Sequence, residues 1–78
     1  MNERMIVMLQ EIYKDRLDKC LGLNIRELGS FILASTSVVV FYLEKLEKLE
    51  YITRIRNRSR SIRITKEGIN FLEDNLYV

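Results

Sequence analysis

The spacing of the apolar residues changes once along the chain, and this change limits the folds that are possible. Up to Leu49, apolar side chains recur every three to four residues, as on one face of an amphipathic helix. From Tyr51 they alternate with polar and basic residues, as in a hairpin with one buried face. The sequence therefore predicts a mainly α fold with a small β-hairpin.

Four helices are expected, three before the hairpin and one after it. Their predicted ranges are 3 to about 19, 25 to about 32, 36 to about 49, and 66 to about 76. Asn24 and Glu27 have the spacing of a capping box at the start of the second helix. Ser35 or Thr36 is expected to cap the third helix, and Thr65 the last one. The turn of the hairpin is expected at residues 57–59.

The same periods predict the core. The residues expected to be buried are Met5, Met8, Leu9, Ile12, Tyr13, Val39, Tyr42, Leu43, Leu46, Ile55, Ile62, Ile64, Ile69, Leu72 and Leu76. Other apolar residues of the terminal helices lie off these stripes: Ile6, Val7, Phe71, Tyr77 and Val78. They either form a dimer surface or are scattered surface hydrophobes.

Composition excludes several kinds of chemistry. The chain has 78 residues, which is enough for a single domain over 1–78, with no histidine and one cysteine, Cys20. A zinc site, a nucleophile activated by histidine and an internal disulfide are therefore excluded. We expect no enzyme activity, no cofactor and no small-molecule ligand. The apolar run near the N-terminus is too short for a secretory signal, so we expect a cytoplasmic protein with no membrane partner and with Cys20 as a small hydrophobe.

The positive charge is concentrated in one segment. The whole chain carries a formal charge of +2. Residues 51–66 hold six basic groups and no acidic one, which leaves seven basic groups against 11 acidic ones elsewhere, a net charge of −4. Arginines so close together with no acidic partner in the segment repel one another unless a polyanion compensates them. The segment is therefore either a nucleic-acid-binding surface or a solvated hairpin.

The order of the predicted elements favours the first interpretation. Two helices, a tight turn, a longer helix, a basic hairpin and a final helix make up a winged helix-turn-helix: three helices, a two-stranded wing and a C-terminal helix. In such a domain the third helix lies in the major groove of DNA. The wing then reaches phosphates or the adjacent minor groove.

Three segments also resemble the DNA-binding domain of LexA-type repressors: Asn24–Gly29, Leu33–Leu43 and Leu46–Arg54. The chain departs from that family because the turn before Leu33 is shorter and lacks the usual glycine, and because Glu50 occupies the position of a capping glycine. It also contains no counterpart of the self-cleaving protease domain, so we expect no autoproteolytic control. Residues 64–72 are similar instead to the segment that follows the wing in MarR-, PadR- and ArsR-like regulators, in which the last helix often helps to build a dimer.

The resemblance implies base contacts from Ser35, Ser37, Val38, Val40 and Phe41 and backbone contacts from the wing. The complete set of candidate DNA-binding residues is Ser35, Thr36, Ser37, Val38, Val40, Phe41, Arg54, Arg56, Asn57, Arg58, Arg60 and Arg63. The hydroxyl residues are equally expected as helix caps. Val38, Val40 and Phe41 are expected on or near the outward side of the third helix, where thymine methyl groups or a protein partner would cover them.

We therefore expect a sequence-specific regulator of transcription, a repressor, that binds double-stranded DNA with helix 36–49 and wing 54–63. It is expected to act on a pseudo-palindrome as a homodimer formed through the N- and C-terminal helices. The alternative is a winged-helix module that docks on a protein through Val40 and Phe41.

Overall fold

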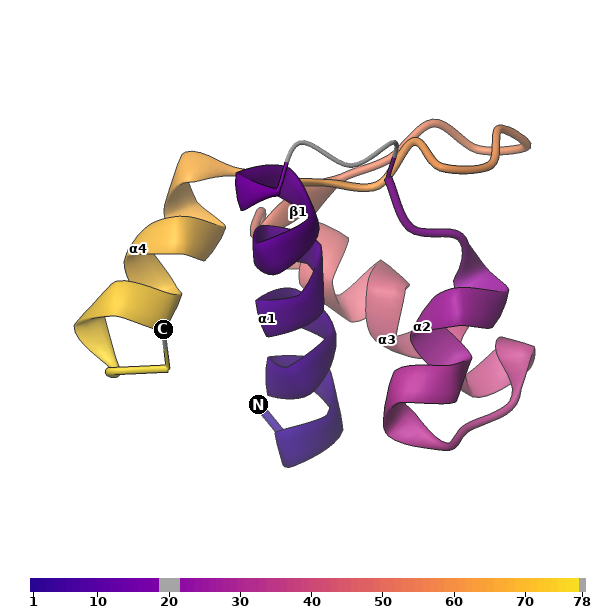
Figure 1. Cartoon of the computed structure of the whole chain (residues 1–78), viewed down its shortest axis with the longest axis horizontal. Coiled ribbons are helices and arrows are strands. Elements are labelled where there is room, and N and C mark those ends of the chain that lie inside the picture. The colour runs from indigo at the N-terminus through magenta and orange to yellow at the C-terminus, as the bar shows by residue number, and fades with distance from the viewer. Residues whose placement is uncertain (19–21, 78) are drawn as a thin grey trace.

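The computed structural model describes residues 1–18 and 22–77, and over these residues the chain forms four helices and a two-stranded antiparallel sheet (Figure 1). The elements are α1 (Glu3–Leu17), α2 (Ile25–Ile32), α3 (Thr36–Lys48), β1 (Ile52–Thr53), β2 (Arg63–Ile64) and α4 (Lys66–Asp74). The predicted order of elements is confirmed. Cys20, predicted to be a small hydrophobe, and Val78, a candidate for the dimer surface, lie outside the described residues.

The starts of α2, α3 and α4 are capped as the sequence predicts. The Asn24 side chain accepts a hydrogen bond from the Glu27 amide at 2.7 Å, and Glu27 Oε1 accepts one from the Asn24 amide at 2.9 Å. This is the expected capping box. Ser35 caps α3, and the Thr65 hydroxyl accepts from the Gly68 amide at 3.0 Å.

Helix α1 is the centre of the core. It lies between α4 on one side and α2 with α3 on the other (Figure 1). The buried hydrophobic residues are Met5, Met8, Leu9, Ile12, Leu28, Ile32, Val39, Leu43, Leu46, Ile52, Ile62, Ile64 and Leu72. Most of the predicted core is therefore confirmed, while Tyr13, Tyr42 and Ile69 are only half-buried.

Two residues predicted to be buried are exposed. Ile55 is 57% exposed because the antiparallel ladder, which pairs Ile52 with Ile64 and Thr53 with Arg63, does not extend to it. Ile52 takes its place in the core. Leu76 is 87% exposed because α4 ends at Asp74, two residues earlier than predicted.

At both departures from the LexA-type pattern, the shortened turn that reaches Leu33 and the position of Glu50, a residue other than glycine adopts the left-handed backbone that glycine favours. Leu33, the C-cap of α2, has a φ of 54°, and Glu50, directly after the C-cap of α3, has a φ of 65°. A side chain at such a backbone conformation costs free energy that glycine avoids. The turns of a winged helix are thus kept here without their usual residue.

Among the described residues, no single helix has the length and apolar composition needed to span a membrane. Helices α2 and α3 reach that length and composition only when taken together, and they are bent by 99° where they meet.

Candidate nucleic-acid interface

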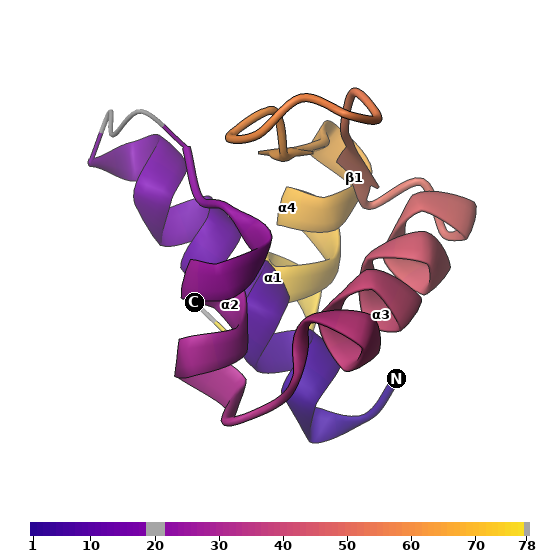
Figure 2. The ribbon, with the colours of Figure 1, turned by 90° about the vertical axis from the view of Figure 1, so that its right-hand side faces the viewer.

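Three segments enclose a groove of about 730 Å³. They are the start of α2, the first turns of α3 and the loop between the two strands, residues 54–62, which we call the wing loop. Figure 2 shows the wing loop at the top of the molecule, with α2 below it on one side and α3 below it on the other. The lining residues are Asn24, Ile25, Arg26, Thr36, Val40 and all nine residues of the wing loop. Within the described chain no acidic residue lines this groove, so its rim is positively charged.

Helix α3 presents two adjoining surfaces. Thr36 and Val40 line the groove, and Phe41 is 53% exposed on the neighbouring face. There a second hollow of about 370 Å³ is lined by Phe41, Glu44, Lys45, Glu47, Lys48 and Arg56. Arg56 borders both hollows and therefore links the wing loop to the whole exposed side of α3.

Three of the candidate residues near the start of α3 do not line the groove. The Ser35 hydroxyl accepts a hydrogen bond from the Val38 amide at 3.5 Å and lies 3.3 Å from the Ser37 hydroxyl, as expected for a cap. Val38 is half-buried, and at about 100° per residue it lies about 160° from Val40 around the helix. Val38 therefore lies on a different side of α3 from Val40, and its predicted base contact stays a prediction.

Two arginines of the wing loop are paired with acidic residues from the helices. Arg54 Nε donates to Glu47 Oε1 on α3 at 2.9 Å, and Arg60 Nη1 donates to Glu27 Oε1 on α2 at 3.0 Å. Neither partner could be seen in the basic segment itself, because Glu27 and Glu47 lie outside residues 51–66. The repulsion inferred from the sequence is thus partly relieved inside the chain.

Arg54 is the most buried of these arginines. Its side chain is only 9% exposed and that of Glu47 is 26% exposed. The Nη2 atom of Arg54 is buried and has no hydrogen-bond partner in the described residues. Its guanidinium group therefore holds the base of the wing loop against α3, although not all of its donors are satisfied.

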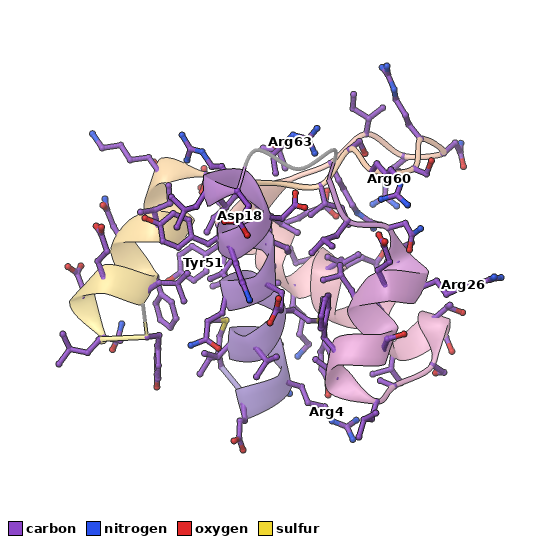
Figure 3. The ribbon with its side chains drawn as sticks, viewed as in Figure 1. Arg4, Asp18, Arg26, Tyr51, Arg60 and Arg63 are labelled. Atoms are coloured by element: carbon purple, nitrogen blue, oxygen red, sulfur yellow. The ribbon has the colours of Figure 1, made fainter. Side chains whose placement is uncertain are left out.

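Arg63 is also engaged within the chain. Its Nη1 donates to the carbonyl oxygens of Arg60 at 2.9 Å and Ile62 at 2.8 Å. Figure 3 shows Arg60 beside the start of α2, while Arg26 projects away from the molecule. Arg26 lines the groove but is not among the predicted DNA-binding residues, because it lies outside the basic segment and the third helix.

Arg56 and Arg58 differ from these three arginines. Both are exposed, and in the part of the chain that the structure describes neither side chain makes a hydrogen bond or an ion pair. Asn57 between them has a φ of 62°, which an asparagine in a turn tolerates. The predicted turn at 57–59 lies within the observed loop, which Ser61 closes by accepting a hydrogen bond from the Ile55 amide at 2.9 Å.

The carboxyl group of Glu27 has a lowered pKa. The hydrogen bond from the Asn24 amide lowers this pKa from its ordinary value of 4.5, and the positive charge of Arg60 lowers it further. Partial desolvation acts in the opposite direction. Glu27 is therefore ionised at neutral pH, as both its cap and its ion pair require.

The fold and the groove define the class of the domain: a winged helix-turn-helix, as the sequence predicts. No family model and no curated protein sequence matches the chain. Among solved structures, the chain is similar to a MepR mutant from a multidrug resistant S. aureus clinical isolate, with a TM-score of 0.77 and 20% sequence identity. The match covers 100% of this chain and 56% of that one, so the chain spans little more than half of the MepR chain. The likeness shows the shared fold, and the resemblance to LexA-type domains in particular stays a prediction.

Proposed function

We propose that the chain is a sequence-specific, double-stranded DNA-binding regulator of transcription that acts as a repressor. The observation that carries this proposal is that α3 and the wing loop share one groove, with Thr36 and Val40 on one wall and Arg56 and Arg58 on the other. An exposed helix beside unpaired arginines is the arrangement that reads base edges and neutralises phosphates together.

The roles of the residues follow from their positions. Thr36, Ser37, Val40 and Phe41 are exposed or half-buried on α3 and would face the major groove, where the apolar side chains can contact thymine methyl groups. Arg56, Asn57 and Arg58 would lie on phosphates or in the minor groove. Arg26 joins the proposed contacts, because it extends the basic rim to α2.

Dimerisation belongs to the same proposal. Figure 1 shows α4 at the opposite end of the molecule from the tip of the wing loop, so a second copy bound there leaves the groove open. Phe71, which the sequence placed on the candidate dimer surface, is half-buried and stacks on Tyr51 with ring centres 5.0 Å apart, so only part of its ring is free to contact a second copy. Leu76 and Tyr77 are the exposed apolar residues at this end of the chain. We also keep the cytoplasm as the proposed location.

The dependence of DNA affinity on salt tests the proposal. The probe is a labelled duplex pool of about 30 base pairs with a randomised centre, long enough for two half-sites one helical turn apart. The dissociation constant of the chain should rise steeply with salt, and changing Arg56 and Arg58 together to Gln should lower the slope of log affinity against log salt by about two.

A matched control separates a contact from a change in net charge. Arg4 is exposed on α1, far from the wing loop (Figure 3), so Arg4→Gln removes one positive charge without touching the groove. It should leave the slope nearly unchanged. An affinity that is indifferent to salt, or a double variant that binds like the wild type, would refute the proposal. It would favour docking of a protein on Val40 and the exposed Phe41.

A further inference from the structure

We infer that Arg60 is a positioning residue, which fixes the wing loop on α2 so that Arg56 and Arg58 face DNA, and that it does not itself bind the duplex. This inference rests on the proposed DNA-binding function. The inference gives Arg60 a different role from Arg56 and Arg58, although the sequence predicts that all three bind DNA.

The Arg60 guanidinium group connects distant parts of the chain. Its Nη1 donates to the carbonyl oxygen of Gly22 at 2.8 Å and to Glu27 Oε1 at 3.0 Å. These acceptors lie 38 and 33 residues earlier in the sequence. Both hydrogens of Nη1 are thus used within the chain, and the carboxylate of Glu27 beside Arg60 compensates its charge and opposes a phosphate there. In the described residues, the side chains of Arg56 and Arg58 have no such contact.

The backbone of Arg60 is held as well. Its carbonyl oxygen accepts a hydrogen bond from Arg63 Nη1 at 2.9 Å, and its φ is 57°. The same oxygen lies against Gly22, where a Cβ atom would be only 2.6 Å away. Gly22 itself has a φ of 105°, so this position combines close approach with a backbone conformation that favours glycine. The part of the wing loop that leads back to β2, residues 60–62, thus packs closely against Gly22.

The ion pair is also linked to the start of α2. Glu27 Oε1 accepts hydrogen bonds from both the Asn24 amide and Arg60 Nη1. One carboxylate therefore closes the capping box and holds the wing loop. Since α2 packs against α3, the wing loop is held in register with the helix proposed to enter the major groove.

A preorganised wing loop loses less conformational freedom when it binds DNA. Without the contacts of Arg60, the segment that carries Arg56 and Arg58 would be held only by Arg54 at its base and by Ser61 within the loop, and DNA binding would have to supply the remaining order. Removing Arg60 should therefore weaken DNA binding even though Arg60 touches no phosphate.

The test compares Arg60→Gln, Glu27→Gln and the double variant on the same randomised duplex pool. Glutamine at position 27 still accepts from the Asn24 amide, so the cap is retained while the charge of the ion pair is lost. If Arg60 positions the wing loop, each single variant should bind about three- to tenfold more weakly, and the double variant should bind no more weakly than either.

The opposite role predicts the opposite sign for Glu27. If Arg60 binds a phosphate, Glu27→Gln frees it and removes a negative charge beside the duplex, so DNA affinity should rise. An affinity that rises or stays constant in Glu27→Gln, or a double variant that is weaker than Arg60→Gln, would overturn the inference.

Hydrogen exchange tests the positioning role without DNA. The amides of Ile55 and Arg58 are bonded within the wing loop, to the Ser61 hydroxyl and the Ile55 carbonyl respectively. They should exchange faster in Arg60→Gln and Glu27→Gln, but not in the control Arg58→Gln. If the wild type fails to bind DNA while these amides respond as expected, the proposed function is wrong and the positioning of the loop is still established. Unchanged exchange in both variants would overturn the inference by itself.

Discussion

The arginines of the wing loop differ in the contacts that their side chains make. Arg56 and Arg58 lie in the middle of the loop, whereas Arg54 lies at its base and Arg60 lies where the loop leads back to β2. The first two are exposed and unpaired within the described chain, while the other two form ion pairs with α3 and α2. All four alternate along seven residues, 54–60, and look equivalent in the sequence. They differ because, among the described residues, the fold brings an acidic side chain within ion-pair distance of Arg54 and Arg60 but not of Arg56 and Arg58.

The contrast changes the meaning of the charge pattern. The formal charge of +6 on residues 51–66 is reduced locally by Glu27 and Glu47, which count toward the acidic remainder of the chain. Formal charge therefore overstates the number of arginines that are free to meet a polyanion. The proposed phosphate contacts are concentrated in the stretch from Arg56 to Arg58.

The largest expected effect on stability comes from substituting Gly22, against which residues 60–62 of the wing loop pack. Gly22→Ala places a Cβ atom against the Arg60 carbonyl at a φ of 105°, so both overlap and backbone strain oppose folding. We expect urea unfolding to show a loss of about 2–4 kcal/mol in the free energy of unfolding. The control is Ser59→Ala, on the exposed loop, which should stay within about 0.5 kcal/mol of the wild type. A Gly22→Ala variant as stable as the wild type would show that the wing loop does not rest on this glycine.

Arg54→Ala should separate stability from binding at the base of the loop. Arg54 is almost wholly buried, and its removal leaves Glu47 without its partner and opens space beside α3. Because Glu47 keeps some contact with water, we expect a loss of about 1–2 kcal/mol in the free energy of unfolding, less than for a fully buried pair. Arg56→Ala, an exposed arginine on the same loop, should change the unfolding free energy by less than about 0.5 kcal/mol. Equal losses of unfolding free energy in the two variants would show that the ion-paired Arg54 and the unpaired Arg56 contribute equally to stability.

The free arginines should show the reverse pattern. Arg56→Ala or Arg58→Ala should weaken binding to the duplex pool by about five- to tenfold near physiological salt, since each removes about one phosphate contact. The melting temperature of either variant should match that of the wild type. Anisotropy titration and thermal unfolding on the same samples measure both quantities. A variant that loses stability would show that its arginine supports the fold, as Arg54 does, and would contradict its assignment as a free arginine.

Local features of this fold could be predicted from the sequence, and long-range contacts could not. The capping box of Asn24 and Glu27 and the cap at Thr65 depend on residues three apart, so their spacing was enough. The ion pair of Glu27 with Arg60 joins residues 33 positions apart, and nothing in either segment indicates the other. Sequence reasoning thus recognised the residues of the wing but not their division of roles.

Errors of burial have a similar cause. Ile55 continues the alternating pattern of the hairpin, yet the pairing of strands stops at Thr53, and no local signal marks that point. Phe71 lies off the buried stripe of its helix but is covered by Tyr51, which precedes the wing. In both cases a tertiary contact, or its absence, overrides the local period.

The smallest expected effect is a shift in the pKa of Glu27. This shift reports directly on the ion pair between Arg60 of the wing loop and Glu27 of α2. The Asn24 amide is the main cause of the lowered pKa and the charge of Arg60 a lesser one, so Arg60→Gln should raise this pKa while leaving it below 4.5. Carboxyl-detected NMR titration of the wild type and the variant measures the difference.

The sign of the pH dependence follows from the direction of that shift. A carboxyl whose pKa is lower in the folded state stabilises the fold fully above 4.5, its ordinary pKa, and loses this contribution as the pH falls through the lowered value. Amide exchange in the wing loop, corrected for intrinsic rates, should therefore accelerate in the wild type over that acidic range and not in Glu27→Gln. A pKa that stays the same in Arg60→Gln would show that Arg60 does not pair with Glu27 in solution. A rise to 4.5 or above would make Arg60, and not the capping amide, the group that chiefly holds this carboxylate ionised.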